Sequence, residues 1–157
     1  MRMAVTIEIA KIVDALETFE GWQAFLNVET GEVEEVSNEM LSMAEETDGD
    51  EEPELSDDDQ DEFDLATKIV SNPENFLSLP DEDDIHEWSI MEKFAESVKS
   101  GRIREELLRA LHARGAYRRF KDAVARHDIQ SDWYEFRDEA LKQIAIGWCE
   151  ANKLTWK

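Results

Sequence analysis

The residues best suited to binding chemistry form a basic run in the second half of the chain. Its cations flank Tyr117 and Phe120 and are Arg114, Arg118, Arg119, Lys121 and Arg126. Arginine forks bind phosphate oxygens bidentately, and a helix beginning after Gly115 would add free backbone N–H groups. A surface for phosphate, nucleic acid or another polyanion is one interpretation of this pattern. The other, which the default of amphipathic helices favours, is a solvated helix face or a partner for the protein's own carboxylates.

Acidic residues dominate the first part of the chain. Residues 1–98 carry 30 acids and 4 bases, whereas residues 99–157 carry 9 acids and 13 bases. Segment 45–64 holds 13 acids, and its mutual repulsion predicts a flexible loop over residues 41–62. A second cluster follows Pro80. The candidates for an acidic surface that engages a basic protein, as a nucleic-acid mimic would, are Asp57, Asp58, Asp59, Asp61, Asp81, Asp83 and Asp84.

The same acids do not predict a defined metal site. Asp57, Asp59 and Asp61 have the opening spacing of a calcium loop, but the sixth position is Glu62 and the twelfth is Lys68. Zinc is not expected either, because the ligands that zinc prefers are far apart. These are His86, His112, His127 and the lone Cys149.

Catalysis is not predicted, because the chain has no nucleophile elbow, phosphate loop or zinc-protease motif. We therefore expect no catalytic residue and no cofactor, and a binding or regulatory module in place of an enzyme. Its first partner would be a basic protein at the acidic surface. The alternative is nucleic acid at the basic helix 114–126, and a second alternative is an enzyme with an unrecognised site.

Length and composition bound the class of protein. The chain has 157 residues, a formal charge of −22 and 41% hydrophobic residues, including five Trp. This is enough apolar material for one folded domain. The negative field disfavours binding to anionic membranes, and no segment is apolar enough to span a bilayer. With a single Cys there is no intramolecular disulfide, so we expect a cytoplasmic protein.

The elements that would position these residues are mostly helical. Hydrophobic spacing predicts helices over residues 6–19, 63–70, 81–98, 103–115, 117–124 and 131–148, a hairpin over 22–36 and a short strand over 76–79. The predicted organisation is a helix plus hairpin (1–40), the acidic loop (41–62) and a body of about four helices (63–157), with 1–40 and 63–157 in one domain. The fold class is α+β, mostly α-helical.

Aromatic residues of the last helix allow two interpretations. Trp133, Tyr134 and Trp148 can serve as core residues at helical spacing or as platforms for stacked bases. Trp156, near the end of the chain, can pack back or contact a partner.

Several stretches resemble the bacterial uncharacterised protein family 0158. They are Ile12-Val13-Asp14-Ala15-Leu16-Glu17, Phe25 to Val33, Leu79-Pro80, Met91-Glu92-Lys93-Phe94, Arg114 to Asp122, Trp133-Tyr134 and Trp148 to Asn152. The order and spacing of these pieces carry the resemblance over most of the chain outside the acidic stretch. Ala113 stands where the family usually has Gly, and Tyr117 where Phe is commoner. The resemblance implies no established activity, so function has to be argued from the residues.

Overall fold

The structure is a computed structural model that describes residues 5–17, 21–47 and 54–157, except the side chains of residues 82 and 83. Its elements fall into two compact units. Unit 1 comprises Met1–Leu79 with Ala145–Lys157, and unit 2 comprises Pro80–Ile144. Most described residues are helical and two small sheets accompany them, so the predicted mostly helical α+β class is confirmed. The boundaries predicted from the sequence lie at residues 40 and 62, whereas the two compact units divide the chain after Leu79 and after Ile144.

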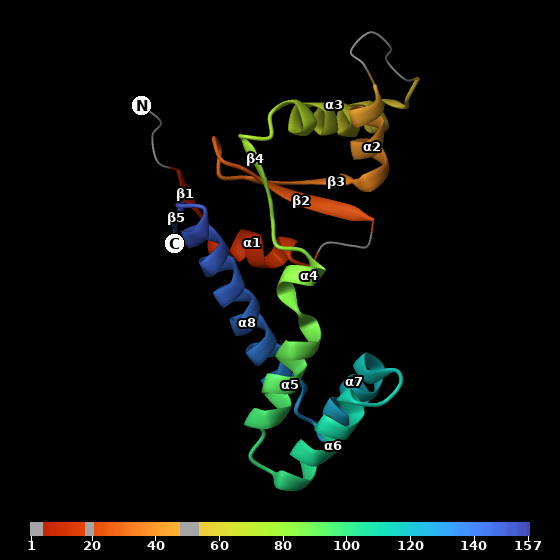
Figure 1. Cartoon of the computed structure of the whole chain (residues 1–157), viewed down its shortest axis with the longest axis vertical. Helices are drawn as coiled ribbons and strands as arrows, with labels where there is room; N and C mark the ends of the chain where they lie inside the picture. Colours follow the sequence, from red (N-terminus) through yellow and green to blue (C-terminus); the bar gives the residue numbers. More distant parts are fainter. Residues whose placement is uncertain (1–4, 18–20, 48–53) are drawn as a thin grey trace. The chain divides into compact units, whose positions relative to one another are not determined.

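A three-stranded antiparallel sheet organises unit 1 (Figure 1). Strands β2 (Trp22–Asn27) and β3 (Val33–Ser37) form the predicted hairpin, and β4 (Phe76–Ser78) pairs with the other edge of β2. The turn between β2 and β3 contains Gly31 at φ 79°, a backbone conformation that side chains with a Cβ rarely adopt. Neighbouring side chains of β2 point to opposite faces, so each face of the sheet can bury its own layer.

Helices cover both faces of this sheet. On the face of Phe25, helices α2 (Asn38–Glu46) and α3 (Asp57–Ser71) lie side by side and bury one apolar cluster. On the face of Leu26, helix α1 (Ile9–Ala15) packs together with the last turns of helix α8 (Gln130–Ala151).

The acidic segment is more helical than its charge suggests. Helix α2 extends to Glu46 and α3 begins at Asp57, so the flexible loop expected over residues 41–62 is wrong at both ends; residues 48–53 lie outside the described part. The Ser56 hydroxyl accepts a hydrogen bond from the Asp59 amide, and the Asp residues of the first turn face the positive end of the helix dipole. The buried stripe of Phe63, Ala66 and Ile69 stabilises the helix further.

The two ends of the chain meet in unit 1. Strand β1 (Thr6–Ile7) pairs in parallel with β5 (Thr155–Trp156), and the Lys157 amide donates a hydrogen bond to the Ile7 carbonyl. The helix predicted from residue 6 therefore begins only at Ile9. Trp156 belongs to this strand pair and its side chain stays exposed.

Unit 2 is helical. It contains α4 (Glu82–Ile85), α5 (Glu87–Ser97), α6 (Gly101–Leu111), α7 (Ala116–Arg126) and most of α8. The single helix predicted over residues 81–98 is interrupted at His86, whose φ of 54° is left-handed and breaks the helical hydrogen-bond pattern. Four helices longer than two turns, α5 to α8, match the predicted helical body.

An aromatic cluster holds unit 2 together. The ring of Trp133 lies 4.9 Å from the Phe120 ring and 5.4 Å from the Phe94 ring, both edge to face, and Phe94 also meets Phe136. Trp133 is 2% exposed and is therefore a core residue, not a stacking platform. Trp148 packs against the apolar cluster of unit 1, whereas Tyr134 is 52% exposed.

Candidate anion-binding groove

A groove of about 870 Å³ lies between α6 and α7 in unit 2. Two carboxylates, Glu106 and Asp122, contribute to its lining together with Gly115. Its other charged lining residues are arginines: Arg109, Arg114, Arg118, Arg119 and Arg126. Cations therefore outnumber acids in this groove, whereas acids outnumber bases more than twofold in the whole chain.

The local sequence explains why these arginines face outward together. Gly115 takes a left-handed conformation at φ 71° and lets the chain reverse between α6 and α7. Helix α7 then buries Phe120, Ala123 and Val124, which places Arg118, Arg119 and Arg126 on the exposed side. Because the two helices are joined by only four residues, the end of α6 lies beside the start of α7.

The start of α7 departs from the usual electrostatics of helices. The positive end of a helix favours acidic side chains and disfavours basic ones. The first turn of α7 has no acid and no side-chain cap, and it carries Arg118 beside Arg119. By contrast, the first turn of α3 carries three Asp residues, which the helix dipole favours. The helix dipole therefore explains why the Asp residues lie at the start of α3, but it does not explain why Arg118 and Arg119 lie at the start of α7.

Only one of the groove arginines has a carboxylate partner among the described residues. Glu106 bridges two neighbours, hydrogen-bonding to the guanidinium of Arg126 and to the ring Nε2 of His127. The other four, Arg109, Arg114, Arg118 and Arg119, form no ion pair within the part of the chain that the structure describes. All four are exposed, so their guanidinium groups are available to an external anion.

The hydrogen bonds of Glu106 to Arg126 and His127 make the free energy of unfolding depend on pH. The hydrogen bond to His127 lowers the pKa of Glu106 below its ordinary 4.5; partial burial opposes this shift, and the charges of His127 and Arg126 add to it. Glu106 has a lower pKa in the folded protein than in the unfolded chain. The pairing therefore stabilises the fold fully when the pH is above the pKa of the unfolded chain, and this stabilisation is lost as the pH falls through the pKa of the folded protein.

We expect Glu106→Gln to lower the melting temperature by only about 1–3 °C near pH 6, because Arg126 is exposed and solvent reaches the partly buried Glu106 as well. Wild-type and variant melting curves should converge as the pH falls through the lowered pKa of Glu106, because the carboxyl of the wild type then becomes protonated. Thermal unfolding followed by circular dichroism measures both. Glu105→Gln is the control, since Glu105 is exposed and has no partner among the described residues. A difference that persists unchanged at low pH would contradict this role.

Not all five cations predicted from the sequence line the groove. Four of the five line the groove, but Lys121 does not: its ammonium lies over the Tyr117 ring, 5.1 Å from the centroid. Sequence reasoning missed Arg109, which comes from α6. The signal was available, because a short connection ending in Gly115 makes α6 and α7 antiparallel neighbours. The basic surface thus belongs to a helical hairpin and not to one helix.

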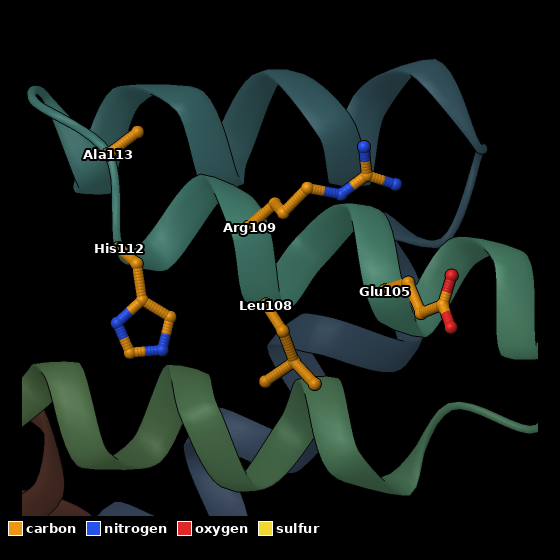
Figure 2. A pocket seen from close by; sticks show the side chains of 5 residues that line it. All are labelled: Glu105, Leu108, Arg109, His112 and Ala113. Atoms are coloured by element: carbon orange, nitrogen blue, oxygen red, sulfur yellow. The ribbon is translucent and has the colours of Figure 1, made fainter.

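Arg109 also borders a second hollow, of about 420 Å³, which is lined by residues of α6 and the two residues that follow it. Figure 2 shows Arg109 extending along α6 on the side of α7, whereas Leu108 and His112 point toward α5. The His112 ring packs edge to face against Trp88, 5.7 Å between centroids, and the Trp88 indole N–H donates to the Leu111 carbonyl. Arg109 and Ala113 line both hollows.

The acidic candidates belong to different units. Asp57, Asp58, Asp59 and Asp61 are exposed on α3 in unit 1. Asp81 and Asp84, in unit 2, cap each other's backbone amides at 3.1 Å. The side chain of Asp83 lies outside the described part.

Within residues 5–17, 21–47 and 54–157, no three His, Cys, Asp or Glu side chains gather as metal ligands would. None of the helices described is both long enough and apolar enough to cross a bilayer.

The part of the chain that contains the groove matches a known protein family. The model of the uncharacterised protein family (UPF0158) matches residues 54–157, which include both helices of the groove. A UPF0158 protein of Pseudomonas aeruginosa is 25% identical over 151 residues, covering 96% of this chain and 85% of its own length. No solved structure matches the chain.

Proposed function

The chain belongs to the uncharacterised protein family UPF0158, a description that assigns no activity, so we propose its function from the groove between α6 and α7. The groove between α6 and α7 binds the phosphates of a nucleic acid or a similar polyanion. The protein acts by binding and not by catalysis, in the cytoplasm as the sequence predicts.

One observation carries this proposal: four arginines without a carboxylate partner among the described residues share one groove in a protein with a charge of −22. Clustered cations repel one another, and two of these also oppose the positive end of α7. A bound polyanion relieves both costs at once. Guanidinium forks on a concave surface are well suited to phosphate oxygens, which accept two parallel hydrogen bonds.

The test is binding of the full chain to a fluorescently labelled oligonucleotide, followed by anisotropy over about 50 to 200 mM salt. Three to five phosphate contacts predict a slope of log K against log salt of about −2 to −3.5 for a single strand. Heparin, a polyanion without bases, should compete for the same groove. Absence of binding to both ligands at the lowest salt would overturn the proposal.

The exposed acids of α3 support a second candidate, a basic protein partner that the acidic surface engages as a nucleic-acid mimic would. It ranks below the groove because the helix dipole already accounts for Asp57, Asp58 and Asp59. A pull-down from the native host with nuclease treatment separates the two. A protein retained after nuclease and lost on neutralising these three Asp residues to Asn supports the acidic surface. Loss of all captured material after nuclease counts against it.

A further inference from the structure

We propose that the outer edge of strand β4 and the hollow beside it bind an extended, basic segment of a partner protein. The segment pairs with β4 as an additional strand and directs alternate apolar side chains into the hollow. This site belongs to unit 1, so the inference goes beyond the anion-binding groove of unit 2 and does not depend on it.

Strand β4 lies at one edge of the three-stranded sheet (Figure 1). Towards β2, the Asn75 carbonyl accepts a backbone hydrogen bond and the Leu79 amide donates one. Because these bonds alternate along an antiparallel strand, Phe76 and Ser78 direct their backbone N–H and C=O groups away from β2. Neither residue has a backbone hydrogen-bond partner on that side among the described residues. The outer edge of β4 therefore presents the groups with which an added strand pairs.

The opposite edge of the sheet, formed by β3, is protected in a way that β4 is not. Soluble proteins keep edge strands from pairing by placing charges on them or by covering their backbone. Strand β3 carries Glu34 and Glu35, and its Ser37 amide donates to the Glu62 carboxylate at 2.9 Å. Strand β4 has the sequence Phe-Leu-Ser and carries no charge. Of the two edges, β4 is thus the one suited to strand addition.

A hollow of about 710 Å³, the β4 hollow, borders this strand. All three residues of β4 line it, together with residues of β2, of α2 and of the end of α3. Its apolar side chains are Phe25, Leu41, Ile69, Val70 and Phe76. In an extended peptide every second side chain points to the same face, so a strand added to β4 directs alternate side chains towards the hollow. Apolar residues at those alternate positions match its lining.

The charge of unit 1 determines which peptides it attracts. Residues 1–79 and 145–157 contain 24 Asp and Glu against 5 Lys and Arg, and Glu45 lines the β4 hollow. This field attracts a basic segment and speeds its encounter with the site. A second copy of the chain brings the same negative charge and is repelled, which disfavours pairing between two β4 strands. The occupant is therefore a segment in which basic residues flank alternating apolar ones.

The experiment measures the fluorescence anisotropy of labelled peptides of about nine residues with the full chain. Each peptide has two lysines at either end and alternates threonine with one apolar residue, which is Val, Leu or Phe. At least one should bind with a dissociation constant of about 1–100 μM. The same peptide with alternate backbone amides N-methylated keeps its side chains but cannot pair as a strand, and it should not bind. Absence of saturable binding for all three parent peptides up to about 1 mM would overturn the inference.

Ser78→Pro tests the strand edge. Proline removes the outward N–H and keeps the hydrogen bonds to β2, since edge strands tolerate proline where the N–H faces away from the sheet. We expect peptide binding to weaken about 10-fold or more, through the lost hydrogen bond and the bulk of the ring at the edge. Circular dichroism checks that the variant folds.

Glu45→Lys tests the hollow without altering the backbone. It should weaken binding of the lysine-flanked peptide about 3- to 10-fold, because a cation replaces the acid that lines the hollow. Glu46→Lys is the matched control, since Glu46 is exposed, does not line the hollow and undergoes the same change of charge. We expect it to change binding by about twofold or less. Equal losses in the two variants would mean that the general field, and not this site, holds the peptide.

The remaining outcomes identify a different occupant or mode of binding. If the N-methylated peptide binds as well as its parent, strand addition is wrong. If sedimentation shows a dimer that Ser78→Pro abolishes, the edge binds a second copy and the assignment to a basic partner is wrong. Ser78→Pro should leave oligonucleotide binding unchanged, so this inference and the proposed function fail in separate measurements.

Discussion

Reversing two charges of the groove, Arg118→Glu together with Arg119→Glu, is expected to weaken nucleic-acid binding by about 100-fold or more. Each arginine contributes a charge-assisted hydrogen bond of about 1.5–3 kcal/mol, and removing two of them corresponds to roughly two to four powers of ten in affinity. The new carboxylates also repel the phosphates. The residual salt slope should be smaller by about 0.7 for each phosphate of a single strand that the variant no longer binds.

The matched control for this variant is Lys93→Glu with Arg102→Glu. Both residues are exposed in unit 2 and neither lines the groove, so the change in net charge is identical while the groove stays intact. We expect the control to reduce affinity by about threefold or less, through the general field alone. Equal reductions in the two variants would mean that overall charge, not the groove, governs binding.

Replacing Trp133 by Ala is expected to destabilise the protein by about 3–5 kcal/mol, the usual cost of removing a buried Trp or Phe ring. The Trp133 ring contacts Phe94 and Phe120 edge to face and is almost fully buried, so its removal leaves a cavity between α5, α7 and α8. Total stabilities are usually about 5–15 kcal/mol, so a large share is removed. The melting temperature should fall by roughly 6–20 °C.

Chemical denaturation followed by far-ultraviolet circular dichroism measures this destabilisation without relying on tryptophan fluorescence. Tyr134→Ala is the natural comparison, because Tyr134 is the next residue of α8 and half of its surface is exposed. We expect that change to cost less than about 1 kcal/mol. If the two variants were equally destabilised, the aromatic cluster would not be the core of unit 2.

The hairpin and the helical body could be predicted because their signals are local. Aromatic and β-branched residues on both sides of the Gly31 turn predict two strands. Apolar residues spaced three or four apart predict each helix of unit 2, and these stripes contribute Phe94, Leu107, Phe120 and Trp133 to its core. These periodicities depend only on backbone geometry. The break at His86 was not predictable, because no glycine or proline marks that left-handed residue.

The acidic segment shows where charge counting is insufficient. Thirteen acids over residues 45–64 predict repulsion and a loop, yet residues from Asp57 onward are helical. The acids of the first turn interact with the helix dipole, and Phe63, Ala66 and Ile69 lie on one face that packs against α2 and the sheet. The total charge of a segment contains neither effect, because both depend on position along a helix.

The sequence by itself determined the family, the mostly helical class, the division of charge and four of the five groove arginines. Only the tertiary structure decided that Arg109 joins them and that the Lys121 ammonium lies over the Tyr117 ring. It also decided that four of the five groove arginines have no carboxylate partner among the described residues. The reason is physical. Helical periodicity specifies the face on which a side chain lies, but a groove and its ion pairs require two helices, and their packing brings together residues whose separation in sequence carries no periodic signal.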